Sequence, residues 1–175
     1  MSDLGILLQH VQEGGSTADE AAVELHDRIQ WKVRGITDGL DLQNLPPPLS
    51  DADLDRLVGE LVQVVETTEP PRGAVVWALG ETLDPRIISP LARVVERYAD
   101  DRGADETHLV YNALSVLDTM DALDTGVLSR IAERQDDLGE LARNLIDVRG
   151  LAESDSSAAR PRPARGTLVW RQLHS

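Results

Sequence analysis

Carboxylates are the side chains of this sequence most able to do chemistry, and one cluster has the spacing of a calcium-binding loop. Asp51, Asp53 and Asp55 alternate as at the start of an EF-hand loop. Such a loop also needs Gly at its sixth position, for a sharp turn, and Glu at its twelfth, to bind the ion with two oxygens. Those positions hold Arg56 and Val62. We therefore interpret the aspartates as charges that stabilise the N-terminal end of a helix.

Two further acidic clusters have spacings that suit helix caps and solvated turns. Their members are Asp118, Asp121 and Asp124 in one, and Asp100, Asp101, Asp105 and Glu106 in the other. Either cluster could bind Ca²⁺ weakly, but turn and cap positions explain both of them without a ligand. The sequence thus predicts no metal site and no cofactor site.

Histidine and cysteine provide no catalytic pattern. The chain contains no cysteine, which excludes disulfides and thiol catalysis. Its four histidines lie on separate segments, without the i, i+4 spacing of a helical metal site: His10, His26, His108 and His174. His26 and Asp27 are neighbours in sequence, and we expect them to point to different sides of one helix rather than to form a dyad. The prediction is that this protein is not an enzyme.

One short pattern occurs three times and organises the elements around it. It reads Leu-x-Arg followed by two apolar residues, and its copies occupy residues 54–60, 91–97 and 128–134. Their starts lie 37 residues apart both times. A helical segment that returns at constant spacing is typical of stacked repeats, because one helical pair cannot bury both of its faces alone.

Apolar residues at helical spacing predict helices over most of residues 1–150. The first helix should end at the glycine pair 14–15, and the second should begin at a capping box from Thr17 to Glu20 and run to about Arg34. After a proline-rich connector, Ser50 should cap the helix that holds the first copy of the repeat.

Five more helices are expected after the first copy. They cover residues 72–83, 85–98, a segment capped by Asp105, the third copy, and residues 138–148. Each hairpin is expected to join a helix, across a turn, to the copy that follows it. The spacing between helices shifts from 35 to 37 residues, which predicts a two-residue insertion in the turn at 121–126.

Composition favours an all-α fold with an acidic surface. Aromatic residues make up 3% of the chain and Phe is absent, which favours helices over sheets. The net charge is -14, and such a charge repels phosphate backbones and attracts cationic surfaces. No stretch approaches the roughly 20 apolar residues that cross a bilayer, and the N-terminus lacks a signal-peptide pattern. We expect a cytoplasmic protein that binds a basic protein and neither nucleic acid nor membrane.

Residues 72–97 resemble the HEAT-like repeat superfamily, and in particular the short repeats of the phycobilisome-lyase type. In this segment Ala-Leu-Gly-Glu ends one helix and an Asp-Pro turn at Asp84 leads into the second copy. The resemblance is weaker over residues 105–134 and fades before Ser50. It implies a short right-handed α-solenoid of HEAT-like helical hairpins, with a concave surface for a partner. It implies no lyase chemistry, because only the repeat is shared.

One feature of HEAT-type repeats is only partly present. Those repeats often pair an aspartate of the turn with an arginine about six residues later, and here Asp124 and Arg130 keep that spacing whereas Asp84 and Arg93 do not. The arginines of the pattern support two interpretations. The structural one, which we favour, pairs each with a carboxylate of its own helix or of an adjacent helix. Within one helix the partners would be Glu60 for Arg56, Glu96 for Arg93 and Glu133 for Arg130. The functional one makes Arg93, Arg97, Arg130 and Arg134 a partner-binding face.

The composition changes at about residue 150. Residues 1–150 are predicted to form the repeat domain, and residues 151–175 a flexible basic tail. Within the tail, residues 167–173 are apolar around Trp170, with Arg171 beside it, and are a candidate docking segment. This segment could bind its own acidic domain, a neighbouring copy or another protein, or it could be inert.

Together these features predict a non-catalytic protein-interaction module, a scaffold or adaptor with an acidic surface for a basic partner. One alternative is an immunity or antitoxin protein that neutralises a cationic toxin. Another is an accessory subunit of a HEAT-like enzyme, of the lyase or glycosylase type. A glycosylase needs a basic groove for DNA, which the net charge opposes. The oligomeric state is left open.

Overall fold

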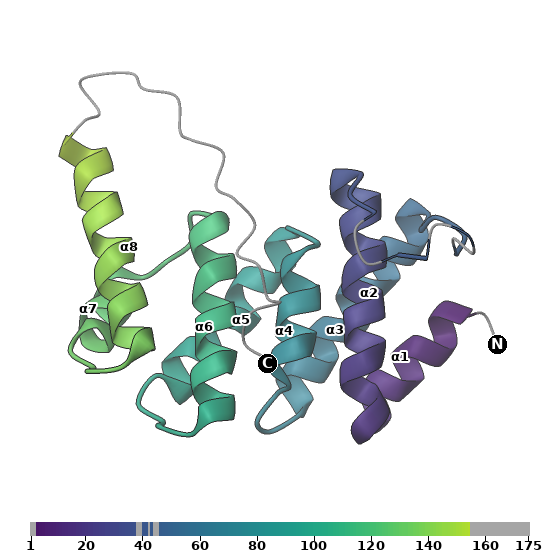
Figure 1. Ribbon diagram of the computed structural model, residues 1–175, viewed down its shortest axis with the longest axis horizontal. Coiled ribbons are helices and arrows are strands. Elements are labelled where there is room, and N and C mark those ends of the chain that lie inside the picture. The colour runs from purple at the N-terminus through teal and green to yellow at the C-terminus, as the bar shows by residue number, and fades with distance from the viewer. Residues whose placement is uncertain (1–2, 38–39, 42, 44–45, 155–175) are drawn as a thin grey trace.

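The computed structural model in Figure 1 describes residues 3–37, 40–41, 43 and 46–154. Helices make up most of this part, and no strand occurs in it. The prediction of an all-α fold is therefore confirmed. None of these helices is both long enough and apolar enough to cross a membrane. The predicted docking segment 167–173, with Trp170 and Arg171, lies outside the described residues.

The chain forms eight α-helices and one 3-10 turn within the described ranges. These are α1 (Asp3–Glu13), α2 (Ser16–Arg34), α3 (Asp51–Thr67), α4 (Gly73–Gly80), η1 (Pro85–Ile87), α5 (Ile88–Tyr98), α6 (Ala104–Thr119), α7 (Thr125–Ala132) and α8 (Asp137–Ser154). Every helix predicted from the apolar spacing is present. The extra length of the third repeat lies mainly in α6, which has 16 residues against the 8 of α4, and not in the turn alone.

Some helices begin at the predicted cap residue, and others begin at a glycine instead. The cap at Ser50 is confirmed: its hydroxyl accepts from the Asp53 backbone N–H, and its own N–H donates to the Asp53 carboxylate at 3.0 Å. The capping box from Thr17 is wrong, because α2 already begins at Ser16. Gly15, whose φ of 82° is in the left-handed region, occupies the N-cap position.

The predicted cap at Asp105 is also wrong. Gly103 takes the N-cap position of α6, and Asp105 lies in the first turn of the helix. A carboxylate at that place still interacts favourably with the positive end of the helix, so the residue type fits although the position is shifted.

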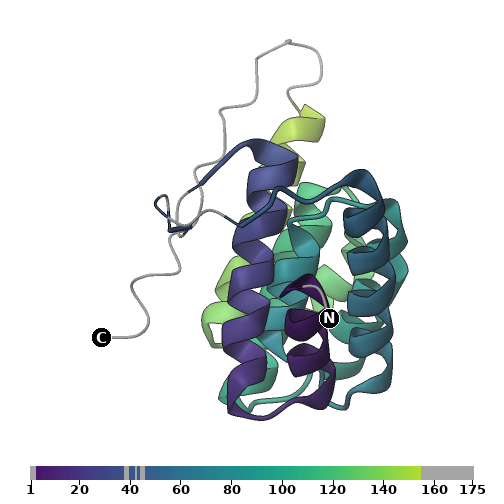
Figure 2. The same ribbon diagram turned by 90° about the vertical axis from the view of Figure 1, so that its right-hand side faces the viewer.

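The helices are arranged in two layers. Helices α2, α4, α6 and α8 lie side by side in Figure 1, and α3, α5 and α7 lie behind them. In this row α4 packs against both α2 and α6, and in the other layer α3 contacts α5. Figure 2 looks along the rows and shows α2 and α3 on opposite sides, with α1 between them. Helix α1 therefore closes one end of the array.

Each helix of the repeated pattern packs most closely against the helix that follows it. Thus α5 packs on α6 and α7 packs on α8, whereas the predicted hairpins joined α4 to α5 and α6 to α7. The path between α4 and α5 explains the difference: Leu83 adopts a positive φ of 50°, and η1 then contacts α3 in the other layer. The predicted pairing of helices is therefore wrong: each copy of the repeated pattern is the first helix of its hairpin and not the second.

Leucines of the repeat fill the core between the layers. Leu91 and Leu128, which begin the second and third copies, are fully buried, while Leu54 at the same place in the first copy is only partly buried. In the row of α2, α4, α6 and α8, a glycine allows α4 and α6 to pack closely. A Cβ on Gly80 of α4 would collide with Val116 of α6, so this glycine sets how closely those helices approach.

Candidate protein-binding groove

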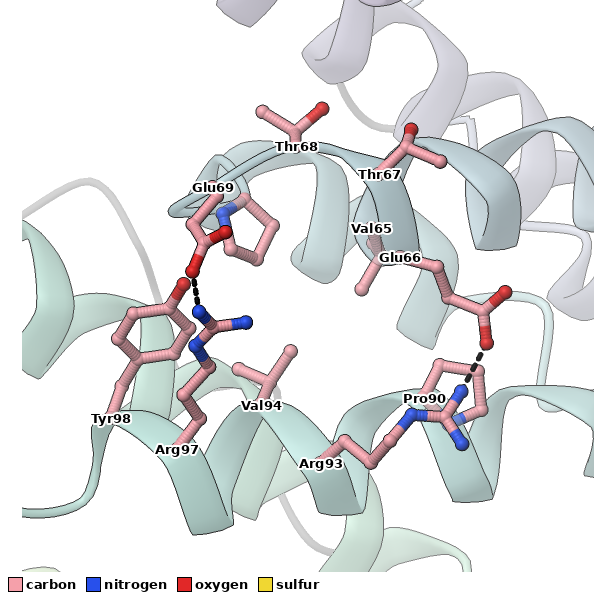
Figure 3. Close-up of a pocket in the computed structure, with 11 residues that line it drawn as sticks. Val65, Glu66, Thr67, Thr68, Glu69, Pro90, Arg93, Val94, Arg97 and Tyr98 are labelled. Carbon is pink, nitrogen blue, oxygen red and sulfur yellow. Dashed lines mark hydrogen bonds and ion pairs between the residues drawn. The ribbon is translucent and has the colours of Figure 1, made fainter.

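A groove of about 250 Å³ lies between the C-terminal end of α3 and one side of α5. Its apolar floor comes from both helices and from a proline in the loop after α3: Val65, Pro71, Pro90, Val94 and Tyr98. Val65 and Val94 point toward the space between the two helices (Figure 3). The floor side chains are buried by the surrounding fold, and Val65, Val94 and Tyr98 belong to the hydrophobic core.

Two ion pairs cross this groove. Arg93 contacts the Glu66 carboxylate and Arg97 contacts the Glu69 carboxylate, and Figure 3 shows one pair on each side of Val94. The arginine side chains are 60% and 61% exposed. Exposed ion pairs of this kind contribute only about 0–1 kcal/mol to stability. A charged group of a partner can therefore compete for either end of each pair at little cost to the fold.

The sequence of α5 explains why these arginines face the groove and the solvent. Leu91, Val94 and Val95 recur at helical spacing and are buried, which leaves Arg93 and Arg97, four residues apart, on an adjoining exposed side of the helix. Arg93 also donates to the Ser89 hydroxyl at 2.9 Å, and the Arg97 guanidinium lies 5.7 Å from the centre of the Tyr98 ring. A second, more open depression continues across α5 and shares both arginines.

A concentration of negative charge lies beyond the Tyr98 end of the groove. Two loops, before α6 and before α8, come together there, since Arg102 contacts Asp136 at 3.5 Å. We call the carboxylates of these loops and of the first turns of α6 and α8 the acidic edge: Asp100, Asp101, Asp105, Glu106, Asp136, Asp137 and Glu140. Asp100 follows Tyr98 by two residues, so a cationic segment leaving the groove at this end would meet the acidic edge.

Arg134 holds the acidic edge together from inside. Its side chain is 4% exposed, and it donates to the backbone oxygens of Ala99 at 2.5 Å and Asp101 at 2.8 Å. It also donates twice to the Asp136 carboxylate, from Nε at 3.0 Å and from Nη2 at 2.6 Å. This arginine is therefore a buried link between two loops, and we withdraw it from the predicted partner-binding face.

The other arginines expected at a binding face have different positions. Arg93 and Arg97 line the groove together, whereas Arg130 is exposed on α7 and donates to the backbone oxygen of Glu96 at 3.5 Å. Trp170 and Arg171 are not among the residues that the structure describes. Among the predicted pairings one turn away, Arg56 with Glu60 is found at 2.7 Å. Arg93 and Arg130 instead reach across to neighbouring helices.

Sequence reasoning missed the acidic side of the groove. Glu66 and Glu69 lie at the end of α3 and just beyond it, before the prolines at 70 and 71. Their partners on α5 are more than twenty residues away, so no local spacing rule connects them. The sequence did hold one signal for a charged site here: two glutamates, Glu66 and Glu69, follow the last apolar residue of the helix, Val65.

His26 and Trp77 form a separate cluster that joins α2 to α4. Their rings stack with centroids 3.3 Å apart, and His26 is 4% exposed. Its Nδ1 lies 3.0 Å from Asp27 and its Nε2 lies 3.5 Å from Glu81, which also pairs with Arg34. We expected the His26 and Asp27 side chains to point to different sides of the helix. This is wrong, because the two side chains are in hydrogen-bond contact. The Trp77 ring covers the imidazole, so the cluster ties helices together rather than facing a substrate.

The described residues bring no three histidines, aspartates or glutamates together in a way that could hold a metal ion. The aspartates at 51, 53 and 55 are instead used at helix ends. Asp51 pairs with Lys32 at 2.8 Å, and Asp55 pairs with Arg86 at 2.8 Å. Hydrogen bonds from Lys32 lower the pKa of Asp51 below its usual range.

Asp136 should give the protein a specific sensitivity to acid. Hydrogen bonds from Arg134, supported by the backbone N–H of Gly139, lower the pKa of Asp136 to about 2. A carboxylate with a lowered folded-state pKa stabilises the fold above its unfolded pKa of about 3.9 and loses that contribution as the pH falls toward about 2. Asp136→Asn should therefore lower the free energy of unfolding by on the order of 1 kcal/mol at neutral pH, after allowance for solvent screening. Below a pH of about 4, the stability of this variant should fall less steeply with pH than that of the wild type.

Urea denaturation followed by circular dichroism at neutral and acid pH measures this effect. The matched control is Asp137→Asn, which removes the neighbouring exposed carboxylate and should keep the pH dependence of the wild type. Equal pH profiles for Asp136→Asn and the wild type would show that the Arg134 contact does not set the acid response.

Comparison of the chain with known protein families, with curated proteins and with solved structures finds no match. The resemblance to HEAT-like repeats thus stays a prediction from the sequence.

Proposed function

We propose that this protein is a non-catalytic interaction module, an adaptor that binds a basic segment of another protein in the groove between α3 and α5. The observation that carries the proposal is the combination in one place of an apolar floor, two exposed carboxylates and an adjoining acidic edge. Interfaces of this composition use an apolar anchor for affinity and charges for orientation and association rate.

The arginines in the groove are compatible with a basic partner. Arg93 and Arg97 each contact one oxygen of their glutamate, and a carboxylate accepts several hydrogen bonds at once. An incoming arginine can therefore share Glu66 or Glu69 without expelling the resident one. The net charge of -14 supplies the longer-range attraction that speeds association.

The proposal includes the finer architecture expected from the sequence, a short right-handed α-solenoid of HEAT-like helical hairpins. Its support is the two-layer arrangement in which α4 packs on both α2 and α6 while α3 packs on α5. In such a stack the helices of one layer present a continuous surface, and here the groove lies on the layer that contains all three copies of the repeated pattern.

Binding of a synthetic peptide tests this function directly. The probe is a short labelled peptide with one tryptophan flanked by arginines, titrated into the full chain at low salt and measured by fluorescence anisotropy. Glu69→Lys should weaken binding about tenfold, which corresponds to about 1.4 kcal/mol, because it removes one groove carboxylate and adds a repelling charge.

The matched control is Glu60→Lys, which makes the same change of charge on α3 at a glutamate that pairs with Arg56 outside the groove. This variant should change the affinity less than about twofold. Equal weakening by both variants would indicate diffuse attraction to the acidic surface and would contradict a groove. Absence of peptide binding to every form of the chain would contradict the function itself.

A further inference from the structure

We propose that the groove between α3 and α5 is occupied by the C-terminal segment 167–173 of the same chain. This inference rests on the proposed function of the groove and adds its resident ligand. The segment contains Leu168, Val169, Trp170 and Leu173, with Arg171 inside it and Arg165 shortly before it. It therefore carries a bulky apolar anchor between two positive charges.

The groove offers the complement of each part of that segment. Its floor of valine and proline side chains, with Tyr98 at one end, suits an aromatic anchor such as Trp170. Figure 3 shows Glu66 and Glu69 on either side of Val94, so each carboxylate is available to one of the positive charges that flank the anchor. The acidic edge beyond Tyr98 suits the remaining arginines of the tail.

The charges of the two parts of the chain are opposite. Residues 152–175 contain four arginines, at 160, 162, 165 and 171, and two acidic residues, which gives a formal charge of +2. The whole chain carries -14, so residues 1–151 carry -16. The most positive segment of the sequence is thus covalently attached to a strongly negative domain, which favours its association with that domain.

The length of the connection favours binding within one molecule. Between the end of α8 at Ser154 and Trp170 there are enough residues to span roughly 50 Å when extended. A compact domain of about 150 residues has a radius of gyration of about 15 Å, so the segment can reach any of its faces. A tether of this kind gives a local concentration in the millimolar range, well above that of a second copy in dilute solution.

A resident segment makes the groove selective. A basic partner must displace it, and the apparent affinity falls in proportion to the fraction of molecules whose groove is open. Partners that match the groove no better than the tail would then be excluded, whereas a better match or a second protein that captures the tail would open the site.

Methyl NMR of the full chain, labelled at valine, tests this occupancy. An indole ring seated on the floor should shift the methyl signals of Val65 and Val94, and Trp170→Ala should move both signals to their open positions. The shifts should not change with protein concentration, because the segment binds within its own molecule. Val23, exposed on α2, provides the control signal that should not move.

Binding of a labelled peptide of residues 160–175 distinguishes occupancy of the groove by the tail from the ability of the groove to bind a basic segment at all. The peptide should bind the Trp170→Ala chain at least about tenfold more tightly than the wild type, because only the wild type has an occupied groove. Glu69→Lys added to Trp170→Ala should abolish that gain, and Glu60→Lys should not.

Three results would overturn the inference. Identical Val65 and Val94 signals in the wild type and Trp170→Ala, with equal peptide binding to both, would leave the groove functional but without its own tail. Shifts that grow with protein concentration would assign the segment to the groove of a second copy. Absence of peptide binding to the Trp170→Ala chain would remove both the inference and the proposed groove function.

Discussion

Arg134→Met should lower the free energy of unfolding by about 3–5 kcal/mol, the range found when one partner of a buried charge network is removed. The wild-type guanidinium is 4% exposed and is bonded to backbone oxygens of Ala99 and Asp101 and to the Asp136 carboxylate. Methionine fills similar space but donates no hydrogen bond. The substitution would leave the oxygen of the buried Ala99 without this donor, and it would remove the buried partner of the Asp136 carboxylate, which is itself 36% exposed.

Urea denaturation of the two proteins at neutral pH measures the loss. Arg102→Met is the matched control, because Arg102 contacts the same carboxylate at 3.5 Å but is 64% exposed. That variant should cost less than about 1 kcal/mol. Arg134→Lys should recover only part of the stability, because one ammonium cannot reproduce the several directions in which the guanidinium donates. Similar small losses for Arg134→Met and Arg102→Met would refute the assigned role.

Leu91→Ala should destabilise the protein by about 2–5 kcal/mol, and Leu128→Ala by a similar amount. Both leucines are fully buried at the start of a copy of the repeated pattern. Each substitution removes apolar contacts and leaves a cavity that close packing fills only in part. Leu54→Ala changes the same place in the first copy, where the side chain is only partly buried, and should cost less than half as much.

Thermal and urea unfolding of the three variants, side by side, would check this order. The test is sharp because the residue type and the motif position are the same in all three, so that only burial differs. A Leu54→Ala loss equal to the other two would mean that the first copy is packed as tightly in solution as the second and third.

Local sequence features predicted the helices well and their ends less well. Apolar spacing located each helix because burial of one side imposes that spacing. Ser50 was found as a cap because a serine directly before an apolar-periodic segment can accept a hydrogen bond from a free N–H of the first helical turn. Thr17 and Asp105 failed for one shared reason: a nearby glycine, at 15 and at 103, began the helix earlier without a side-chain cap.

The packing of helices could not be predicted from the same features. The sequence does not state whether a loop turns a helix back onto its predecessor or carries the chain into the other layer, and Leu83 with η1 does the latter. For the same reason the local pairing rule assigned Arg93 to Glu96, whereas the fold brings Glu66 of α3 within reach.

The arginines of the candidate groove could be predicted from the sequence, but its glutamates could not. The repeated pattern singled out Arg93 and Arg97, but it treated Arg134 as equivalent to Arg97 because both end a copy of the pattern. The third copy ends at the acidic edge, where Arg134 lies in the loop before α8 and donates to backbone oxygens of the loop between α5 and α6. The same motif position is therefore exposed in one copy and buried in the next. The same motif position lies within α5 in the second copy and beyond the end of α7 in the third, so the surroundings of a residue, and not its place in the repeat, decide its role.

The link made by Arg134 has a consequence for how the array comes apart. In a linear stack, where each helix is held by its neighbours, the outermost members tend to fray while the middle stays intact. The pair α7 and α8 occupies such an end, but Arg134 fastens the turn between them to the loop that joins α5 to α6. Opening the end of the stack therefore breaks this bond network as well, and the last two helices melt together with their neighbours as one cooperative unit.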